Sequence, residues 1–319
     1  MKILITGVAG FIGFSFAKHL LNKKIIVYGI DNLDNYYSVR FKNLRVRELR
    51  KSKNFHFKKI DITKKTILKK YFANKNFDFI FHFAAQAGVR YSLINPKKYL
   101  RVNRDGFENV INNIKKMDNL KRVFYASSSS VYGSRKKFPS KENSNLLPQS
   151  IYAKTKLQNE NFAKKVSDKT GINLIGLRFF TVYGEWGRPD MFIFKILYAH
   201  KKNKLFYLNN YGNHERDFTY IKDVVTILEK LIRVKIFKHK ILNICSSRPI
   251  NIKRISDYLK KKLKIKKIIE SKKNNYDVNK THGDNRLLMK YVKFKKFTNF
   301  KVGLNNTVNW YLNRKIFRL

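Results

Sequence analysis

A tyrosine and a lysine four residues apart, Tyr152 and Lys156, have the side chains that proton transfer requires. On a helix this spacing places both side chains on one face. A phenol ionises at about pH 10, too high for a base at neutral pH, but a neighbouring ammonium stabilises the phenolate. The pair could therefore exchange a proton with a hydroxyl group, although the same spacing also occurs on ordinary helix surfaces.

A run of four serines supports the catalytic interpretation of this pair. Residues 127–130 are all serine, and they follow an apolar segment, residues 122–126, that is typical of a buried strand. Parallel sheets bind ligands at the carboxyl ends of their strands, so a serine hydroxyl there could bridge a substrate oxygen and Tyr152. Such a run is often only a polar loop. Its place between a strand and the Tyr–Lys pair favours catalysis.

The first glycine-rich segment has the composition of a phosphate-binding turn. Gly7, Gly10 and Gly13 lie between a short apolar run and a helical pattern, with Phe11 and Ile12 inside the segment. Glycine permits the tight turn, lets backbone N–H groups reach a pyrophosphate and allows the helix to pack closely on the strand. The strand–turn–helix context predicts a dinucleotide site.

An acidic residue after the second predicted strand indicates which dinucleotide binds. Asp31 lies 18 residues after Gly13, where a carboxylate can accept both ribose hydroxyls of NAD. It would repel a 2′-phosphate, and Asn32 rather than arginine follows, so the sequence predicts NAD and not NADP. The alternative is that Asp31 merely begins a turn. Asp61 and Ile62, after the third predicted strand, are expected to contact the adenine.

Alternating strands and helices are expected to position these groups. The predicted strands are residues 2–6, 25–30, 55–60, 77–83, 122–126 and 173–179, and the predicted helices include 11–21, 96–116 and 152–170. Parallel strands need crossover connections, so the alternation predicts an α/β fold with a doubly wound parallel (Rossmann-type) sheet. We assign residues 1–180 and about 217–245 to this domain. Residues 181–216 and 246–319 are expected to form a smaller mixed α/β lobe.

Composition narrows the class of protein. With 43% hydrophobic residues, the 319-residue chain can bury a sizeable core. Its single cysteine, Cys245, cannot form an intramolecular disulfide, and no metal site is expected. The chain begins without a signal-like apolar core, and no apolar run approaches the roughly 20 residues that span a bilayer. We therefore expect a cytoplasmic protein with no membrane partner.

The formal charge of +49 raises the question of a nucleic-acid partner. The excess is mostly lysine, spread along the chain, and it accompanies abundant Asn, Ile, Phe and Tyr. These residues share A/T-rich codons, so a base bias of the genome explains the set. We expect no nucleic-acid partner, although the charge could help to attract anionic substrates.

Together these motifs resemble the extended short-chain dehydrogenase/reductase family, in its NAD-dependent epimerase/dehydratase branch. The resemblance rests on the glycine turn, Asp31, residues 82–85 (His-Phe-Ala-Ala), the serine run, the Tyr–Lys pair and residues 178–180 (Arg-Phe-Phe). It implies that Tyr152 is the acid/base, that Lys156 lowers its pKa and holds the nicotinamide ribose, and that Ser128 assists. The further cofactor contacts that it implies are Phe83, Ala84, Ala85, Asn103 and Phe179.

The residues after the catalytic serine indicate which reaction of this branch is performed. Dehydratases of the branch carry an Asp-Glu pair there, and the decarboxylases carry a Glu at the second position. This chain has Ser129 and Ser130 instead. The resemblance therefore favours a 4-epimerase, in which hydride leaves carbon 4 and returns to the opposite face of a 4-keto sugar.

Several segments are similar to those of UDP-glucuronate 4-epimerases. They are residues 31–37, 86–92, 181–184, 186–191 and 216–220. The resemblance implies conversion of UDP-glucuronate to UDP-galacturonate, with the UDP-sugar bound by the smaller lobe. We expect Thr181, Arg188 and the serines at 128, 129 and 130 to hold the uronate carboxylate, Arg216 the pyrophosphate, and Arg90 and Arg286 other parts of the substrate.

Other functions stay open at this point. Within the same fold, the substrate could be a neutral UDP-hexose such as UDP-glucose or UDP-GlcNAc, or the enzyme could decarboxylate UDP-glucuronate. A non-catalytic NAD-sensing or RNA-binding protein is also conceivable, but the intact Ser128, Tyr152 and Lys156 argue against it. The resemblance further suggests a homodimer that packs through the helices predicted at 96–116 and 152–170.

Overall fold

The computed structural model describes residues 1–73, 75–115, 117, 119–265, 268–272 and 278–313. The chain forms two compact units. The first consists of Met1–Gly133, Asn145–Phe179 and Val225–Leu242, and the second of Ser134–Ser144, Phe180–Val224 and Asn243–Leu319.

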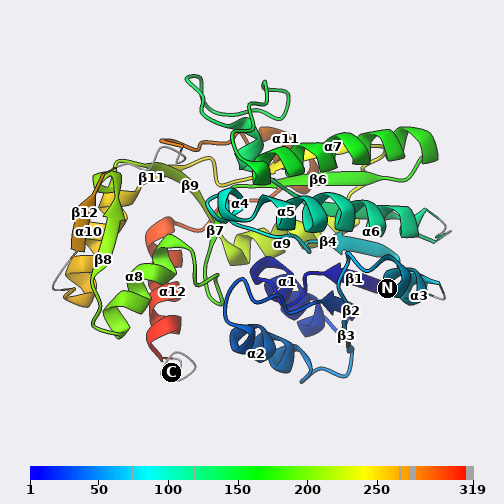
Figure 1. The fold of residues 1–319 in the computed structure, drawn as a ribbon, viewed down its shortest axis with the longest axis horizontal. Coiled ribbons are helices and arrows are strands. Elements are labelled where there is room, and N and C mark those ends of the chain that lie inside the picture. The colour runs from blue at the N-terminus through cyan, green and yellow to red at the C-terminus, as the bar shows by residue number, and fades with distance from the viewer. Residues whose placement is uncertain (74, 116, 118, 266–267, 273–277, 314–319) are drawn as a thin grey trace. The chain divides into compact units, whose positions relative to one another are not determined.

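The first unit is built on a mainly parallel sheet (Figure 1). In spatial order its strands are β10 (Lys240–Ile244), β6 (Leu174–Phe179), β5 (Arg122–Ser128), β4 (Phe79–His82), β1 (Lys2–Thr6), β2 (Ile26–Asp31) and β3 (Phe55–Lys59). The pairs from β6 through to β3 are all parallel. The strand order reverses between β1 and β4, which is where doubly wound sheets bind their ligands. This sheet confirms the predicted fold class.

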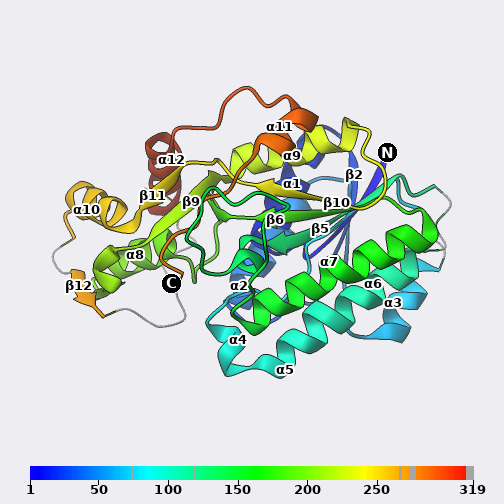
Figure 2. The same ribbon diagram turned by 90° about the horizontal axis from the view of Figure 1, so that it is seen from above.

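Helices cover both faces of this sheet because its strands are apolar on both sides. The helices of the first unit are α1 (Phe11–Asn22), α2 (Val39–Leu49), α3 (Lys65–Phe72), α4 (Tyr91–Ile94), α5 (Pro96–Tyr99), α6 (Gly106–Ile114), α7 (Ile151–Thr170) and α9 (Ile221–Arg233), the last from Val225 onward. Figure 2 shows α3, α6 and α7 on one face and α1 and α9 on the other. Between α6 and the sheet lies a core that includes Ile80, Phe107, Val123 and Tyr125.

The helix predicted over residues 96–116 is interrupted. After α5 the chain forms a π-helix, η1 (Leu100–Asp105), before α6 begins. Within η1, the Asn103 side chain accepts a hydrogen bond from the Gln86 backbone N–H (2.7 Å) and donates one to the Gln86 carbonyl (3.0 Å). These bonds hold the bulge against the loop after β4. Such π-bulges are common at functional sites, and hydrophobic periodicity does not reveal them. Residue 116 lies outside the described part of the chain.

The second unit is a mixed α/β arrangement, as predicted. Its strands β11 (Pro249–Asn251), β9 (Glu215–Tyr220) and β7 (Thr181–Tyr183) form one sheet, and β12 (Ile268–Ser271) pairs with β8 (Phe206–Asn209). Its helices are α8 (Phe192–Lys201), α10 (Ile252–Leu263), α11 (Arg286–Val292) and α12 (Phe300–Asn313), with a short turn of helix η3 (Asn210–Gly212).

The division of the chain differs from the expected boundaries chiefly at two places, with smaller shifts at Phe180 and after Leu242. Residues 217–224 belong to the second unit, because β9 pairs with β7 and β11 there. Ser134–Ser144 also joins the second unit. Its Ser140 donates a backbone hydrogen bond to His282 and accepts one from Asp284, both 2.8 Å long. These bonds join segments far apart in sequence, so composition along the chain could not reveal them.

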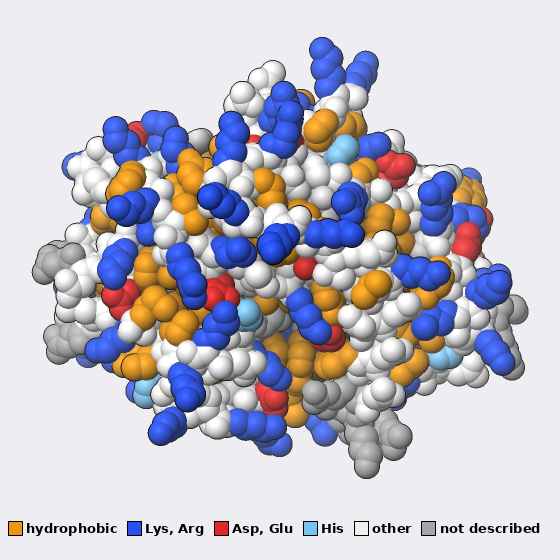
Figure 3. Space-filling model, turned by 180° about the vertical axis from the view of Figure 1, so that it is seen from behind, with side chains coloured by type: hydrophobic (Ala, Val, Ile, Leu, Met, Phe, Trp, Pro, Cys, Tyr) orange, Lys and Arg blue, Asp and Glu red, His pale blue; other side chains and the backbone are white. Residues whose placement is uncertain are grey.

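The surface charge is spread widely. Lys and Arg side chains are scattered across the face shown in Figure 3 and do not gather in one stripe. In the described part of the chain, no helix is both long and apolar enough to cross a membrane.

Candidate functional site

The glycine turn is shaped by close backbone contacts. Gly7 has a φ of +72°, and a Cβ there would lie 2.7 Å from the backbone nitrogen of Ala84. A Cβ on Gly13 would lie 2.3 Å from the Gly7 carbonyl oxygen. Helix α1 begins after Gly10 with no side-chain cap and no acidic residue in its first turn, so no side chain competes with an anion there. This geometry fits a pyrophosphate.

Asp31, at the end of β2, is tied to the same turn. Its carboxylate is 8% exposed and accepts hydrogen bonds from the backbone N–H groups of Ala9 (3.0 Å) and Leu33 (2.8 Å). Burial raises the pKa of Asp31, and Lys42 is the strongest opposing influence. A carboxylate has about four acceptor positions, so two ribose hydroxyls can still be accommodated. The turn and Asp31 therefore fit the two parts of a dinucleotide that they are predicted to hold.

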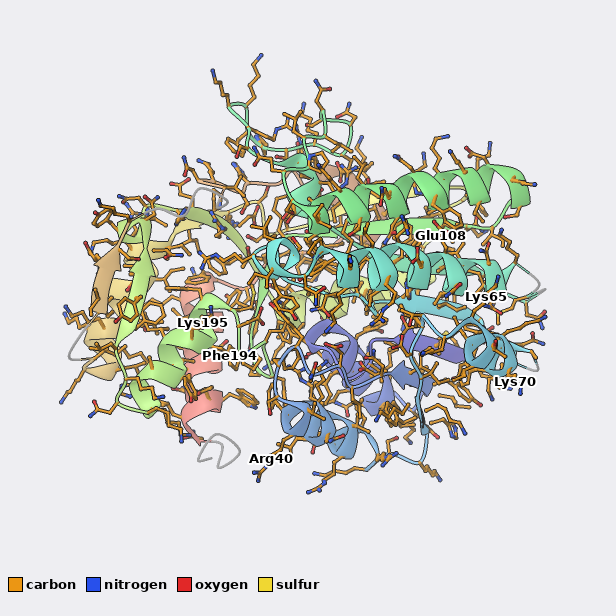
Figure 4. The ribbon with its side chains drawn as sticks, viewed as in Figure 1. Arg40, Lys65, Lys70, Glu108, Phe194 and Lys195 are labelled. Atoms are coloured by element: carbon orange, nitrogen blue, oxygen red, sulfur yellow. The ribbon has the colours of Figure 1, made fainter. Side chains whose placement is uncertain are left out.

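Two buried cations on α2 support this corner and were missed from the sequence. Arg45 is fully buried, and its Nη1 donates to the Ala9 carbonyl (2.8 Å) and to the Tyr37 hydroxyl (2.7 Å). Lys42 donates from Nζ to the Asp34 carbonyl (2.6 Å). Arg40, labelled in Figure 4, is exposed on the same helix. In a chain with 70 Lys and Arg residues, nothing marked these two as different.

The predicted adenine contacts are Asp61 and Ile62, and Asn32, another predicted cofactor residue, lies beside them. Asn32 donates from its side chain to the Asp61 carboxylate (3.3 Å), which also accepts from the Thr63 backbone N–H (2.8 Å). Ile62 is buried against Gly106 at the start of α6. Asn32, Asp61 and Ile62 are thus held by the ends of β2 and β3.

The predicted cofactor residues after β4 are held by β1 and by the π-helix. Thr6 accepts backbone hydrogen bonds from Phe83 at its carbonyl and from Ala84 at its hydroxyl, both 3.1 Å long. The Phe83 ring meets Phe179 edge-on, with centroids 5.9 Å apart. Ala85 is half-buried in the following loop. Asn103 is committed to Gln86 and to the Thr155 hydroxyl, so it joins this loop to α7.

Tyr152 and Lys156, the predicted catalytic pair, lie in the first turns of α7, as the spacing predicts. Ser150 caps the helix by accepting the Ala153 N–H (3.1 Å). The Lys156 Nζ lies 5.9 Å from the Tyr152 ring centroid and donates to the Ala126 carbonyl on β5 (2.8 Å). Burial lowers the pKa of Lys156 to about 8, with Glu160 acting in the opposite direction. At neutral pH Lys156 is therefore mainly an ammonium beside the phenol.

The serine run divides between two environments. Ser128 begins a short helix, η2 (Ser129–Tyr132), in which its hydroxyl accepts the Ser130 N–H and donates to the Ser130 hydroxyl, both 3.1 Å long. Ser127, whose side chain alternates to the other face of β5, donates to Glu160 (2.5 Å). Because Lys156 is bonded to Ala126, two residues before Ser128, the ends of β5 and α7 are held together.

A buried tyrosine supports Tyr152 and was also missed. Tyr99 is fully buried at the end of α5, and its ring meets Tyr152 edge-on with centroids 6.2 Å apart. Its hydroxyl shares its single proton between the carbonyls of Ala87 (2.8 Å) and Gly88 (2.6 Å). Tyr99 therefore joins Tyr152 to the loop that carries Arg90, which is exposed.

In the second unit, the arginine expected to bind the uronate meets a carboxylate of its own chain. Arg188 binds Asp190 through two hydrogen bonds, Nε to Oδ1 (3.0 Å) and Nη2 to Oδ2 (2.5 Å). Thr181 is half-buried at the first position of β7. An anionic substrate group at Arg188 would have to share the guanidinium with Asp190.

The other predicted substrate residues are also engaged. Arg216 donates to the backbone carbonyls of Glu215 (2.9 Å) and Asn279 (3.1 Å). Arg286 is largely exposed and pairs with Asp284, with Nη2 2.6 Å from Oδ2. Between these segments the buried Asp217 accepts from the Ser246 hydroxyl (2.9 Å) and the Gly283 N–H (3.0 Å). As ligand contacts, these arginines stay predictions.

Comparisons with known proteins agree with the motifs. A model of the NAD dependent epimerase/dehydratase family matches residues 3–245. UDP-glucuronate 4-epimerase 4 of Arabidopsis thaliana is 35% identical and aligns over 98% of this chain and 76% of its own. The UDP-glucuronic acid 4-epimerase of Bacillus cereus, crystallised with UDP-glucuronic acid and NAD, is 27% identical with a TM-score of 0.90, over 98% of this chain and 99% of its own. The UDP-N-acetylglucosamine 4-epimerase of Methanobrevibacter ruminantium is 26% identical with a TM-score of 0.87, over 98% of each chain.

The family match includes the glycine turn, Asp31, the serine run and the Tyr–Lys pair. It confirms the predicted family branch, and the NAD dependence of that family confirms the predicted cofactor. This chain belongs to the NAD-dependent epimerase/dehydratase family.

Proposed function

We propose that this protein interconverts UDP-glucuronate and UDP-galacturonate by NAD-dependent inversion of carbon 4. The observation that carries the proposal is the Tyr152–Lys156 pair next to a β5 end that offers hydroxyls and no carboxylic acid. Ser129 and Ser130 occupy η2, and the Ser130 hydroxyl is bonded to Ser128. The acids that dehydratases and decarboxylases of this branch carry at these positions are absent, which favours inversion as the outcome of a 4-keto sugar.

The residues of the first unit would act as follows. When bound, NAD supplies an acceptor for the hydride of carbon 4 and later its donor. Tyr152, as phenolate, takes the proton of the C4 hydroxyl, and the Lys156 ammonium favours that phenolate. Ser128 donates to the same oxygen. The keto sugar then turns so that the opposite face of carbon 4 receives the hydride. Tyr152 returns the proton to the oxygen, and carbon 4 is inverted.

The substrate part of the proposal is supported by relatives. The Arabidopsis thaliana and Bacillus cereus proteins act on UDP-glucuronate by name. A 4-keto uronate is a β-keto acid that loses CO₂ readily, so its carboxylate must be held away from the orientation that favours C–C cleavage. We assign this task to Thr181, Arg188 and the serines, with Arg216 on the pyrophosphate and with Arg90 and Arg286 on other parts of the UDP-sugar.

A product assay tests the proposal. Purified protein is incubated separately with UDP-glucuronate and UDP-galacturonate, and the nucleotide sugars are resolved by chromatography. We expect both reactions to reach the same mixture of the two uronates. Release of CO₂ with formation of a UDP-pentose would instead identify a decarboxylase. Failure to convert either uronate under conditions in which a neutral UDP-hexose is epimerised would overturn the substrate assignment.

One observation favours a second candidate, 4-epimerisation of neutral UDP-hexoses. The charge of Arg188 is already compensated by Asp190 in a two-bond ion pair. A neutral sugar would leave that pair intact, whereas a uronate must compete with it. The Methanobrevibacter ruminantium relative, a UDP-N-acetylglucosamine 4-epimerase by name, belongs to this class. Comparing kcat/KM for UDP-glucuronate, UDP-glucose and UDP-GlcNAc decides between the two.

A further inference from the structure

Four buried side chains in the first unit form one connected polar network behind the catalytic residues. Arg178 on β6 binds Glu160 on α7 through Nε (2.9 Å) and Nη2 (2.6 Å). Ser127 on β5 donates to the same carboxylate (2.5 Å), and Arg178 donates from Nη1 to the Tyr132 hydroxyl (2.9 Å). Arg178 also lies over the Tyr132 ring, 4.8 Å from its centroid. All four residues are less than 5% exposed.

Each member of this network is next to a residue of the catalytic site. Glu160 follows Lys156 by one helical turn on the same face of α7. Ser127 immediately precedes Ser128. Tyr132 ends η2, the short helix that contains Ser129 and Ser130. The network therefore joins β5, η2 and α7, which carry the serines, Tyr152 and Lys156, to the neighbouring strand β6.

Glu160 is the acidic side chain that faces Lys156. Around the Lys156 ammonium, α7 contributes Tyr152 and Glu160, β4 contributes His82, β5 contributes the Ala126 carbonyl, and β6 contributes Arg178 beyond Glu160. Burial, with Lys156 nearby, lowers the pKa of His82 to about 3, so His82 is neutral. Glu160 alone among these ionisable groups favours the ammonium, against the burial that disfavours it.

Stability alone is a poor reason to retain such a network. Replacing a buried ion pair with apolar residues of similar volume is often neutral or stabilising, because both charges are costly to desolvate. The network does have an electrostatic effect that apolar packing could not supply. It holds one negative charge at a fixed place beneath a buried lysine.

We propose that Glu160, fixed by Arg178, is a positioning residue that keeps Lys156 protonated and holds α7 in register with the end of β5. It acts through Lys156 and touches no reacting atom. This inference rests on the assignment of Tyr152 and Lys156 in the proposed function, but not on its uronate substrate. It applies to whichever UDP-sugar the wild-type protein epimerises.

The test compares Glu160→Gln with Glu160→Asp. For each variant, the affinity of the stripped protein for NAD is measured by calorimetry between pH 6 and pH 10, and kcat is measured over the same range. In Glu160→Gln no carboxylate opposes the effect of burial on the pKa of Lys156, so Lys156 loses its proton at lower pH. We expect the alkaline decline of both NAD affinity and kcat to begin about one pH unit lower in Glu160→Gln. Glu160→Asp keeps the charge, so it should restore the wild-type midpoint while kcat stays reduced.

A matched control removes a carboxylate elsewhere in the same unit. Glu108, labelled on α6 in Figure 4, is half-buried and outside the network. Glu108→Gln changes the net charge by the same amount and should leave the midpoint unmoved. An equal shift in both glutamine variants, or no shift in Glu160→Gln, would overturn the proposal.

Glu160→Gln leaves a buried guanidinium unpaired, so its folding must be checked by circular dichroism. If it fails to fold, Glu160→Gln/Arg178→Met removes both charges together. The midpoint should then fall in the same direction by less than one unit, because the repulsion from Arg178 is also gone. An unchanged midpoint in this folded double variant would refute the role of Glu160. If the wild-type protein itself turned over none of the UDP-sugars, the proposed function would be wrong. The effect of Glu160 on NAD binding would still be tested by calorimetry.

Discussion

The ion pair between Arg188 and Asp190 allows the uronate assignment to be tested by replacing either partner. Arg188→Ala removes the guanidinium and leaves Asp190 as a bare carboxylate where the substrate carboxylate is expected. Arg188 is about one-fifth exposed, so the interaction is only partly screened by solvent. A hydrogen bond to a charged group contributes about 1.5–3 kcal/mol, which corresponds to about a 10- to 150-fold loss of kcat/KM for UDP-glucuronate.

The reciprocal variant is Asp190→Asn. It removes the competing carboxylate while preserving the size of the side chain and one acceptor for Arg188. We expect kcat/KM for UDP-glucuronate to rise, chiefly through a lower KM, since the guanidinium is freed for the substrate. For UDP-glucose, both variants should stay within about threefold of wild type, because no charged group is lost from that complex.

Steady-state kinetics on both substrates supply the measurement. Arg233→Ala serves as the control, because this arginine is mostly exposed on α9 and pairs with Glu229. Its kcat/KM should match the wild type for each substrate. The reasoning is refuted if Arg188→Ala reduces turnover of the two UDP-sugars equally, or if Asp190→Asn slows turnover of UDP-glucuronate.

Three further variants test the first unit. Tyr152→Phe should lower kcat by at least about 10²-fold while NAD still binds with wild-type affinity in calorimetry, and near-normal turnover would contradict the acid/base assignment. Asp31→Ala removes the acceptor for the ribose hydroxyls and should weaken NAD binding by about tenfold or more, with KM for the UDP-sugar unchanged. Tyr99→Phe leaves the half-buried carbonyls of Ala87 and Gly88 without their hydroxyl donor, so urea unfolding should show a loss of about 0.5–1.5 kcal/mol. An unchanged urea concentration at the unfolding midpoint would show that the Tyr99 hydroxyl contributes no net stability.

The sequence predicted the sheet and the placement of Tyr152 and Lys156 on one helix because local patterns determine them. Strand and helix periodicity located β1 to β6 to within two or three residues, and the spacing of Tyr152 and Lys156 placed them on one face of α7. The glycine turn was predictable for a similar reason. Its glycines are required by contacts with Ala84 and with the turn itself, which leave no room for a Cβ.

What escaped prediction depends on long-range contacts. The roles of Arg45 and Glu160 follow from partners 36 and 33 residues away, Ala9 and Ser127, and their residue types are common on helix surfaces. The π-helix at Asn103 results from its bonds to Gln86, which no periodicity reveals. The roles of the four substrate arginines were predicted only by resemblance, and like the homodimer they stay predictions.

The burial of acidic side chains changes the charge balance of the protein surface. Only 21 Asp and Glu residues accompany 70 Lys and Arg residues, and several of the acids, including Asp31, Glu160 and Asp217, are buried. The surface is therefore poorer in negative charge than the composition alone suggests, and its cations repel one another. Dissolved salt reduces this repulsion, with a screening length of about 8 Å at physiological ionic strength. The folded state of this protein should accordingly gain stability as ionic strength rises, with the largest gain at low ionic strength.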